Sequence, residues 1–250
     1  MSNPVSTATD TASRRKLPFP IEFYRSAIGK KWVMAVTGIL LIGFVIAHLV
    51  GNLKIFLPME ASGAYEIDEY GHALRQLFYP ILPRHIALWI MRVGLIVAFA
   101  LHVHASVGLT LINHRARTID YQGPRQYLVA NYASRTMRWS GFIVLAYLFF
   151  HLADFTWGIQ PFAPEGWARG YIHDNFLFTF SRPPVTALYV LANLLLGIHL
   201  FHGAWSMFQS LGLNHPRFNL WRRWFAIGLA TLITVGNVSM PLAVQFGLIK

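Results

Sequence analysis

The chain has 250 residues, of which 55% are hydrophobic and 12% are charged, so it is not a disordered protein, which needs low hydrophobicity and high charge. It has no cysteine, which excludes a disulfide scaffold, a cysteine nucleophile and any zinc–thiolate or iron–sulfur site built by this chain alone. The net charge of +11 fits either a nucleic-acid-binding protein or the cytoplasmic bias of a membrane protein, and its placement along the chain decides between them.

The hydrophobic residues are concentrated in five stretches, each long enough for the about 20 apolar residues of a membrane helix. The predicted spans are about 32–53, 86–112, 137–157, 185–211 and 224–244. Pro241 predicts a kink or an early stop in the fifth span. Residues 1–30 are predicted to form a cytoplasmic segment that is partly disordered, and 31–250 one membrane domain without an evident internal repeat. The expected fold is an all-α integral membrane protein, a bundle of five transmembrane helices.

The basic residues are concentrated in the segments on one side of these spans. Of the 21 Lys and Arg residues, 14 precede the first span or lie in the loops after the second and fourth spans. The positive-inside rule therefore predicts a cytoplasmic N-terminus and an external C-terminus. Nucleic acid is not an expected partner, because no base-reading motif accompanies the charge.

Histidines recur inside the first four spans, where ionisable groups are costly and are candidates for function. At about 1.5 Å per residue, His48 and His151 fall toward the outer face on spans that run outward. His102 and His199 fall toward the inner face on spans that run inward. The sequence thus predicts an outer pair on spans one and three and an inner pair on spans two and four.

Two imidazoles from facing helices are the ligands that a six-coordinate haem iron requires. The alternative is that each histidine only hydrogen-bonds a neighbouring helix. His104 lies about 200° around the helix from His102, so we expect it to be structural or a hydrogen-bond partner. His202 shares a face with His199, and either residue could be the ligand. The remaining histidines are expected to be solvated at span ends or in loops: His72, His85, His114, His173 and His215.

Several short motifs, in this order, resemble the membrane anchor, or cytochrome b subunit, of bacterial succinate dehydrogenase or fumarate reductase (complex II), in its single-chain, five-helix class. The resemblance covers about 22–245. Its motifs are 25–31 (RSAIGKK) with 34–38 (MAVTG), 47–53 (AHLVGNL) with Phe56, His102 with 113–117 (NHRAR), 139–141 (WSG) with His151 and Leu152, and 199–203 (HLFHG) with Ser206, Gln209 and 211–214 (LGLN).

The resemblance implies a subunit of an enzyme rather than an enzyme by itself. Such an anchor in the bacterial cytoplasmic membrane holds a flavoprotein subunit and an iron–sulfur subunit on its cytoplasmic face. Electrons from succinate reach a quinone, commonly menaquinone, at the membrane. Many members carry two b haems, and by resemblance His48 with His151 and His102 with His199, or with His202, would be their ligands.

A quinone site near the iron–sulfur subunit needs hydrogen-bond donors at the inner face. The candidates are Arg25, Ser26, Lys30, Lys31, Trp32 and His114. Lys54 and Arg138, near helix ends, could pair with haem propionates. Some members of the class that the chain resembles use an outer carboxylate for a second quinone site, although loop solvation is the expected role of Glu66, Asp68 and Glu69 here. The inner loop at 121–131 is expected to dock the iron–sulfur subunit.

Three alternatives remain open at the level of the sequence. One is a haem-free anchor in which two imidazoles bind an iron of a Rieske-type [2Fe–2S] centre, its cysteines coming from a partner subunit. Another is an anchor that lines the quinone pocket without any redox centre. The third, from a different class, is a transporter or proton channel built on histidines, for which Asp154 is the acidic residue closest to a span interior.

Overall fold

The computed structural model describes residues 18–61, 63–116 and 132–250, and within them it is all-helical, without a strand. The long helices are α2 (Ala27–Asn52), α4 (Ile86–Arg115), α5 (Tyr132–His151), α7 (Pro183–Ser210) and α8 (Asn219–Gln245). A π-helical segment, η2 (Leu152–Trp157), continues α5. In the described part of the chain, five helical stretches are therefore long and apolar enough to cross a membrane, which confirms the five-helix fold.

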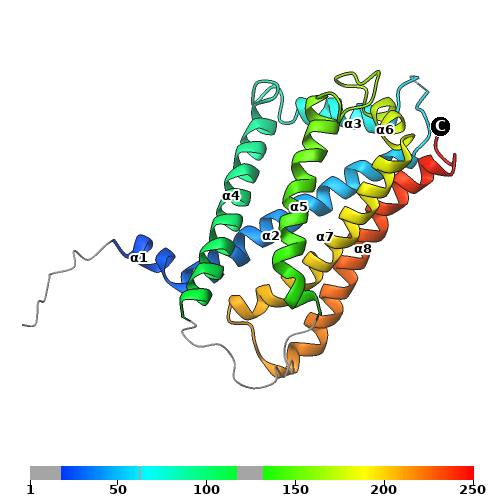
Figure 1. Ribbon diagram of the computed structural model, residues 1–250. Helices are drawn as coiled ribbons and strands as arrows, with labels where there is room; N and C mark the ends of the chain where they lie inside the picture. Colours follow the sequence, from blue (N-terminus) through cyan, green and yellow to red (C-terminus); the bar gives the residue numbers. More distant parts are fainter. Residues whose placement is uncertain (1–17, 62, 117–131) are drawn as a thin grey trace, which may run out of the picture.

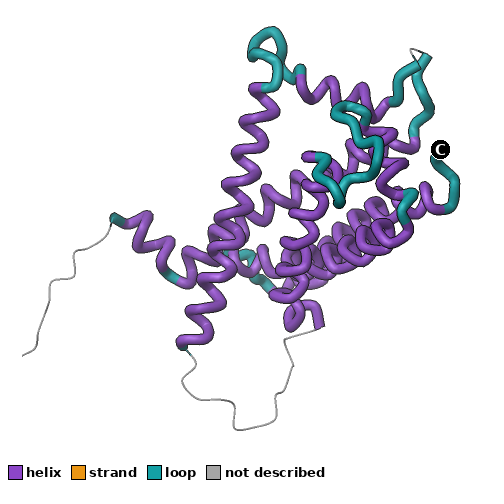
Figure 2. The backbone as a smooth tube through the Cα atoms, turned by 45° about the horizontal axis from the view of Figure 1, so that its top comes forward, coloured by secondary structure: helices purple, strands orange, loops and turns teal. Residues whose placement is uncertain are grey.

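Short elements occupy the two ends of the bundle (Figure 1). α3 (Glu66–Arg75) and α6 (Ile172–Phe180) lie at the end that also holds the C-terminus, which we call the α3/α6 end. α1 (Phe19–Arg25) lies at the opposite end, the α1 end. In Figure 2 the described loops, drawn in teal, connect the ends of the helices. Two 3-10 turns complete the described elements: η1 (Leu53–Phe56) and η3 (Pro216–Phe218).

The helix ends differ from the expected ones for local reasons. α2 begins five residues earlier than its apolar stretch, because the Ser26 side chain accepts a hydrogen bond from the Gly29 amide at 2.9 Å and so caps the helix. Of the two outcomes expected at Pro241, a kink or an early stop, the early stop is wrong, since α8 continues through it to Gln245. Pro241 is fully buried, and transmembrane helices tolerate proline where neighbouring helices support the backbone.

The core of the bundle lies between α2, α7 and α8. Its buried residues include Leu49, Tyr189, Leu200 and Ile233. Glycine permits the close approach of α8 to α2, because a Cβ on Gly236 would stand 2.8 Å from a methyl carbon of Leu49. Such contacts through small residues are typical of helix packing in membranes.

α4 occupies the edge of the bundle and packs chiefly against α2, which crosses behind α4 and α5 in Figure 1. Its apolar side chains are largely uncovered, and Ile96, for example, is 64% exposed. Large apolar side chains also face outward on the other long helices, including Val36, Phe142, Leu191 and Leu232. Outward-facing apolar surface of this extent suits lipid rather than water, so the chain is a multi-pass transmembrane protein.

Candidate functional site: paired intramembrane histidines

His48 and His151 lie side by side near the α3/α6 end. His48 is in the last turn but one of α2, and His151 is the final residue of α5. Their ring centroids are 5.9 Å apart, and the rings are nearly perpendicular at 84°. The pair predicted from depth along the spans is therefore brought together from two helices.

This separation suits a metal held between two imidazoles. A metal–imidazole bond is about 2.0–2.1 Å long, so two such bonds with their ring radii separate the centroids by about 6 Å. Among the described residues, no three His, Asp or Glu side chains gather closely enough to hold an ion. A haem fits such a pair, because its ring supplies the other four ligands and the protein only the two axial ones.

Hydrogen bonds at the His151 ring define which of its nitrogens is free. Nδ1 of His151 lies 3.3 Å from the hydroxyl of Tyr189, and that hydroxyl donates to the carboxylate of Asp154 at 2.8 Å. Because the hydroxyl already donates its one hydrogen bond to Asp154, the Tyr189 oxygen accepts from Nδ1–H. Nε2 of His151 is left with its lone pair, as a metal ligand requires.

The other two paired histidines, His102 on α4 and His199 on α7, have equivalent surroundings. Thr37 Oγ1 lies 3.2 Å from Nδ1 of His102 and donates its own proton to the Val33 carbonyl at 2.6 Å. Ser140 Oγ lies 3.4 Å from Nδ1 of His199 and likewise donates to the carbonyl of Met137, at 3.0 Å. Both hydroxyl oxygens are thus acceptors for Nδ1–H, and Nε2 again keeps its lone pair.

Glycines make room for these two rings against the neighbouring helices. A Cβ on Gly38 would stand 3.5 Å from Cε1 of His102, and a Cβ on Gly141 would stand 3.3 Å from Cε1 of His199. His102 and His199 are also near enough to influence each other electrostatically. We refer to the two sets below as the His48–His151 pair and the His102–His199 pair.

α2 and α5 carry a repeated pattern that the sequence analysis missed. Thr37-Gly38 on α2 and Ser140-Gly141 on α5 each receive a histidine from the following long helix. In both helices a histidine, His48 or His151, follows the glycine by ten residues. A hydroxyl residue followed by a glycine, with a histidine ten positions after that glycine, was the available signal in the sequence.

The remaining span histidines have different surroundings. The ring of His104 stacks on Tyr24 and its Nδ1 is hydrogen-bonded to the Tyr24 hydroxyl, which confirms the expected role as a hydrogen-bond partner. Lys30 lies over the same tyrosine ring, 4.3 Å from its centroid. His202 is near His199, but it is His199 that contacts the Ser140 hydroxyl.

The residues predicted to bind quinone lie on α1, the start of α2 and the end of α4, and α2 packs against both other elements. The hydroxyl of Ser26 is already committed, since it donates to the Phe23 carbonyl at 2.6 Å and caps α2. Lys30 is buried, whereas Arg25, Lys31 and Trp32 are exposed. His114 Nε2 lies 3.2 Å from the guanidinium of Arg138. No quinone geometry follows from these contacts, and this site stays a prediction.

The acidic residues after α2 have structural partners. Lys54 donates to Glu66 at 3.0 Å, and this hydrogen bond lowers the pKa of the Glu66 carboxyl below its usual value. Asp68 accepts from the backbone amides of Ile172 and His173 at 2.6 and 3.1 Å, and so ties α3 to α6. The expectation of a solvated His173 is wrong, since it is only 3% exposed and stacks on Tyr65.

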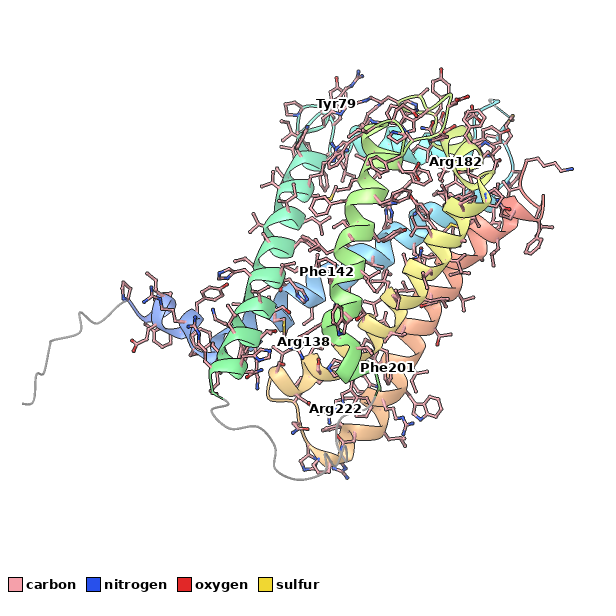
Figure 3. The ribbon with its side chains drawn as sticks, in the orientation of Figure 1. Tyr79, Arg138, Phe142, Arg182, Phe201 and Arg222 are labelled. Atoms are coloured by element: carbon pink, nitrogen blue, oxygen red, sulfur yellow. The ribbon has the colours of Figure 1, made fainter. Side chains whose placement is uncertain are left out.

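Figure 3 shows Arg182 at the α3/α6 end and Arg138 and Arg222 at the α1 end. Arg14, Arg15, Lys16, Arg117, Arg125 and the predicted docking loop at 121–131 lie outside the described residues. Comparisons with models of protein families, with characterised proteins and with solved structures found no match. Any assignment of function therefore depends on the residues themselves.

Proposed function

We propose that this chain is the membrane anchor, or cytochrome b subunit, of a bacterial succinate:quinone oxidoreductase. In this proposal the His48–His151 pair and the His102–His199 pair each hold a b haem. The supporting observation is that three of these four imidazoles have Nδ1 facing a hydroxyl whose own proton is committed elsewhere. The order of the sequence motifs supports the more specific assignment to complex II.

In this function the role of the chain's own residues is to bind the haems and to orient the imidazole rings that hold them. A b haem, when bound, supplies a one-electron carrier within the hydrocarbon layer, which no side chain of the two pairs supplies alone. The four paired histidines would hold the haems through their Nε2 nitrogens. Thr37, Ser140 and Tyr189 fix the ring tautomers, and Gly38 and Gly141 leave room beside the inner rings.

His48 and His151 lie near the α3/α6 end, whereas His102 and His199 lie in the middle of α4 and α7. Two haems held there would supply electron carriers at two depths of the membrane. We place the α1 end in the cytoplasm, where the flavoprotein and iron–sulfur subunits would dock and a quinone, commonly menaquinone in this class, would bind. The basic residues of that end, including Lys31 and Arg138, support this orientation.

The first test is a reduced-minus-oxidised visible spectrum of the purified protein, with haem quantified per chain as its pyridine adduct. We expect two haems per chain, and one in each of His48→Ala and His102→Ala. The matched control is His104→Ala, on the same helix as His102, which should retain both haems.

The same preparation tests the assignment to complex II. A flavoprotein and an iron–sulfur subunit should co-purify with the chain, and the complex should reduce a quinone with succinate. Absence of haem together with a paramagnetic signal of an imidazole-ligated iron–sulfur centre would replace the haem proposal by the Rieske-type alternative. Absence of both centres would contradict an electron-carrying role.

A further inference from the structure

A buried carboxylate lies next to the His48–His151 pair. Asp154, in η2, is completely buried and accepts hydrogen bonds from three side chains. Arg182 Nη2 donates at 2.9 Å, Tyr189 Oη at 2.8 Å and Thr179 Oγ1 at 3.2 Å. A buried charge is costly, and breaking its pairing is strongly destabilising, so the position of this group is well defined.

Asp154 follows His151 by three residues along the chain. The helix widens into a π turn directly after His151, and such turns are frequent at functional sites. The partners of Asp154 come from the end of α6 and from the start of α7. Tyr189, two turns into α7, is 4% exposed and stands between the carboxylate and the imidazole.

We infer that Tyr189 and Asp154 are positioning residues for His151, with Arg182 and Thr179 holding Asp154 in place. This inference rests on the proposed function. The Tyr189 hydroxyl donates a hydrogen bond to Asp154 and accepts one from Nδ1–H of His151, which fixes both the tautomer and the rotation of the ring. Outer hydrogen-bond partners of this kind orient ligating histidines and raise their basicity.

The arrangement predicts an effect on one haem only. Tyr189→Phe removes the acceptor for Nδ1–H but keeps the aromatic ring and its packing. Loss of such a partner typically weakens binding by about 10- to 100-fold. The ring nitrogen also becomes less electron-rich, so the midpoint potential of the haem at the His48–His151 pair should rise while that of the other haem stays unchanged.

Tyr147→Phe is the matched control. Tyr147 is also an aromatic neighbour of His151, with ring centroids 5.9 Å apart. Among the described contacts, the Tyr147 hydroxyl has no hydrogen bond to His151. Nδ1 of His151 instead faces the Tyr189 hydroxyl. Loss of this hydroxyl should leave both haems as in the unchanged protein.

The experiment compares the unchanged protein, Tyr189→Phe, Asp154→Asn and Tyr147→Phe in detergent. It measures the midpoint potential and the low-spin paramagnetic signal of each haem, and the rate of haem transfer to apomyoglobin. We expect one signal to change in Tyr189→Phe, the same signal to change in Asp154→Asn, and none in Tyr147→Phe.

Unchanged potentials and signals in Tyr189→Phe would overturn the inference while leaving the haem proposal intact. An equal shift of both haems would also overturn it, since it would indicate a general change of the bundle. If Asp154→Asn fails to accumulate, Tyr189→Phe still tests the inference, because this variant retains the Asp154–Arg182 pair. Absence of haem from the unchanged protein would instead contradict the proposed function.

Discussion

The two histidine pairs contain the same residue type but differ in what stands behind each ring. In the His102–His199 pair, both Nδ1 atoms face neutral hydroxyls, and those hydroxyls donate to backbone carbonyls of their own helices. In the His48–His151 pair, the ring of His151 is linked through Tyr189 to the ionisable side chain of Asp154. Among the described residues no side-chain hydrogen bond reaches His48, whose ring stacks on Phe44.

If the proposed haems are present, this difference predicts that the two have unequal midpoint potentials although their ligands are the same residue type. A hydrogen bond that leads to a carboxylate makes an imidazole more electron-rich than one that leads to a backbone carbonyl. More electron density on the ligand favours the oxidised metal, and second-shell hydrogen bonding is one of the features that set haem potential. The comparison therefore predicts the lower potential at the His48–His151 pair.

The largest expected effect is the loss of a haem, and it distinguishes one histidine pair from the other. His151→Ala and His199→Ala should each lose one haem of two. The haem left in His199→Ala should titrate at a lower potential than the haem left in His151→Ala, because only the former is held by the carboxylate-linked ring. A redox titration of the two variants measures this difference, and equal potentials would remove the contrast between the pairs.

The next effect is on folding and concerns the carboxylate alone. Asp154→Ala leaves Arg182 without its acidic partner and removes the acceptor of Tyr189 and Thr179. Leaving a buried donor without its acceptor costs about 1–3 kcal/mol, so unfolding in detergent should occur at a lower temperature or denaturant concentration. Glu165→Ala, at an exposed position, should change the unfolding transition little. Similar transitions in the two variants would show that the Asp154 network contributes little to stability.

The histidine pairs and the Asp154 network differ in how far they can be predicted from the sequence. The apolar stretches predicted the five helices, and depth along the spans brought His48 and His151 together correctly. Tyr189 was missed because it is 38 residues from His151 along the chain, and hydropathy does not report how a helix is rotated about its axis. The role of Asp68 was missed for a related reason, since its partners are amides more than 100 residues away.

A smaller effect tests the fit of the His102–His199 pair. A Cβ on Gly141 would stand 3.3 Å from His199, whereas a Cβ on Gly38 would be in ordinary contact with His102 at 3.5 Å. An imidazole forced off its rotamer costs about 0.5–1.5 kcal/mol, so Gly141→Ala should release the haem of this pair roughly three- to tenfold faster. Gly38→Ala should have less effect.

Gly43→Ala is the control for both, because a Cβ there meets nothing within 4 Å and the gain in helix propensity is the same. The rate of haem transfer to apomyoglobin is measured for all three glycine variants. Equal rates for Gly141→Ala and Gly43→Ala would mean that glycine is not needed beside His199.

The smallest effect lies outside the pairs, at the ion pair of Lys54 and Glu66. The pKa of Glu66 is lowered in the folded protein, mainly by its hydrogen bond from Lys54. Its contribution is therefore complete above the unfolded-state pKa of glutamate, about 4.3, and is lost as the pH falls through the lower folded-state value. The unfolding temperature of the unchanged protein should fall more than that of Glu66→Gln on acidification. Parallel curves of unfolding temperature against pH for the two proteins would contradict this prediction. Glu66→Gln should leave the histidine pairs unaffected at neutral pH.

The position of α4 bears on the order in which the molecule is assembled. α5, α7 and α8 pack in sequence, α5 on α7 and α7 on α8, whereas α4 stands at the edge and packs chiefly against α2. α5 likewise packs chiefly against one long helix, α7. If the proposed haem of the His102–His199 pair enters before the bundle closes, α4 or α5 can therefore be the last long helix to pack.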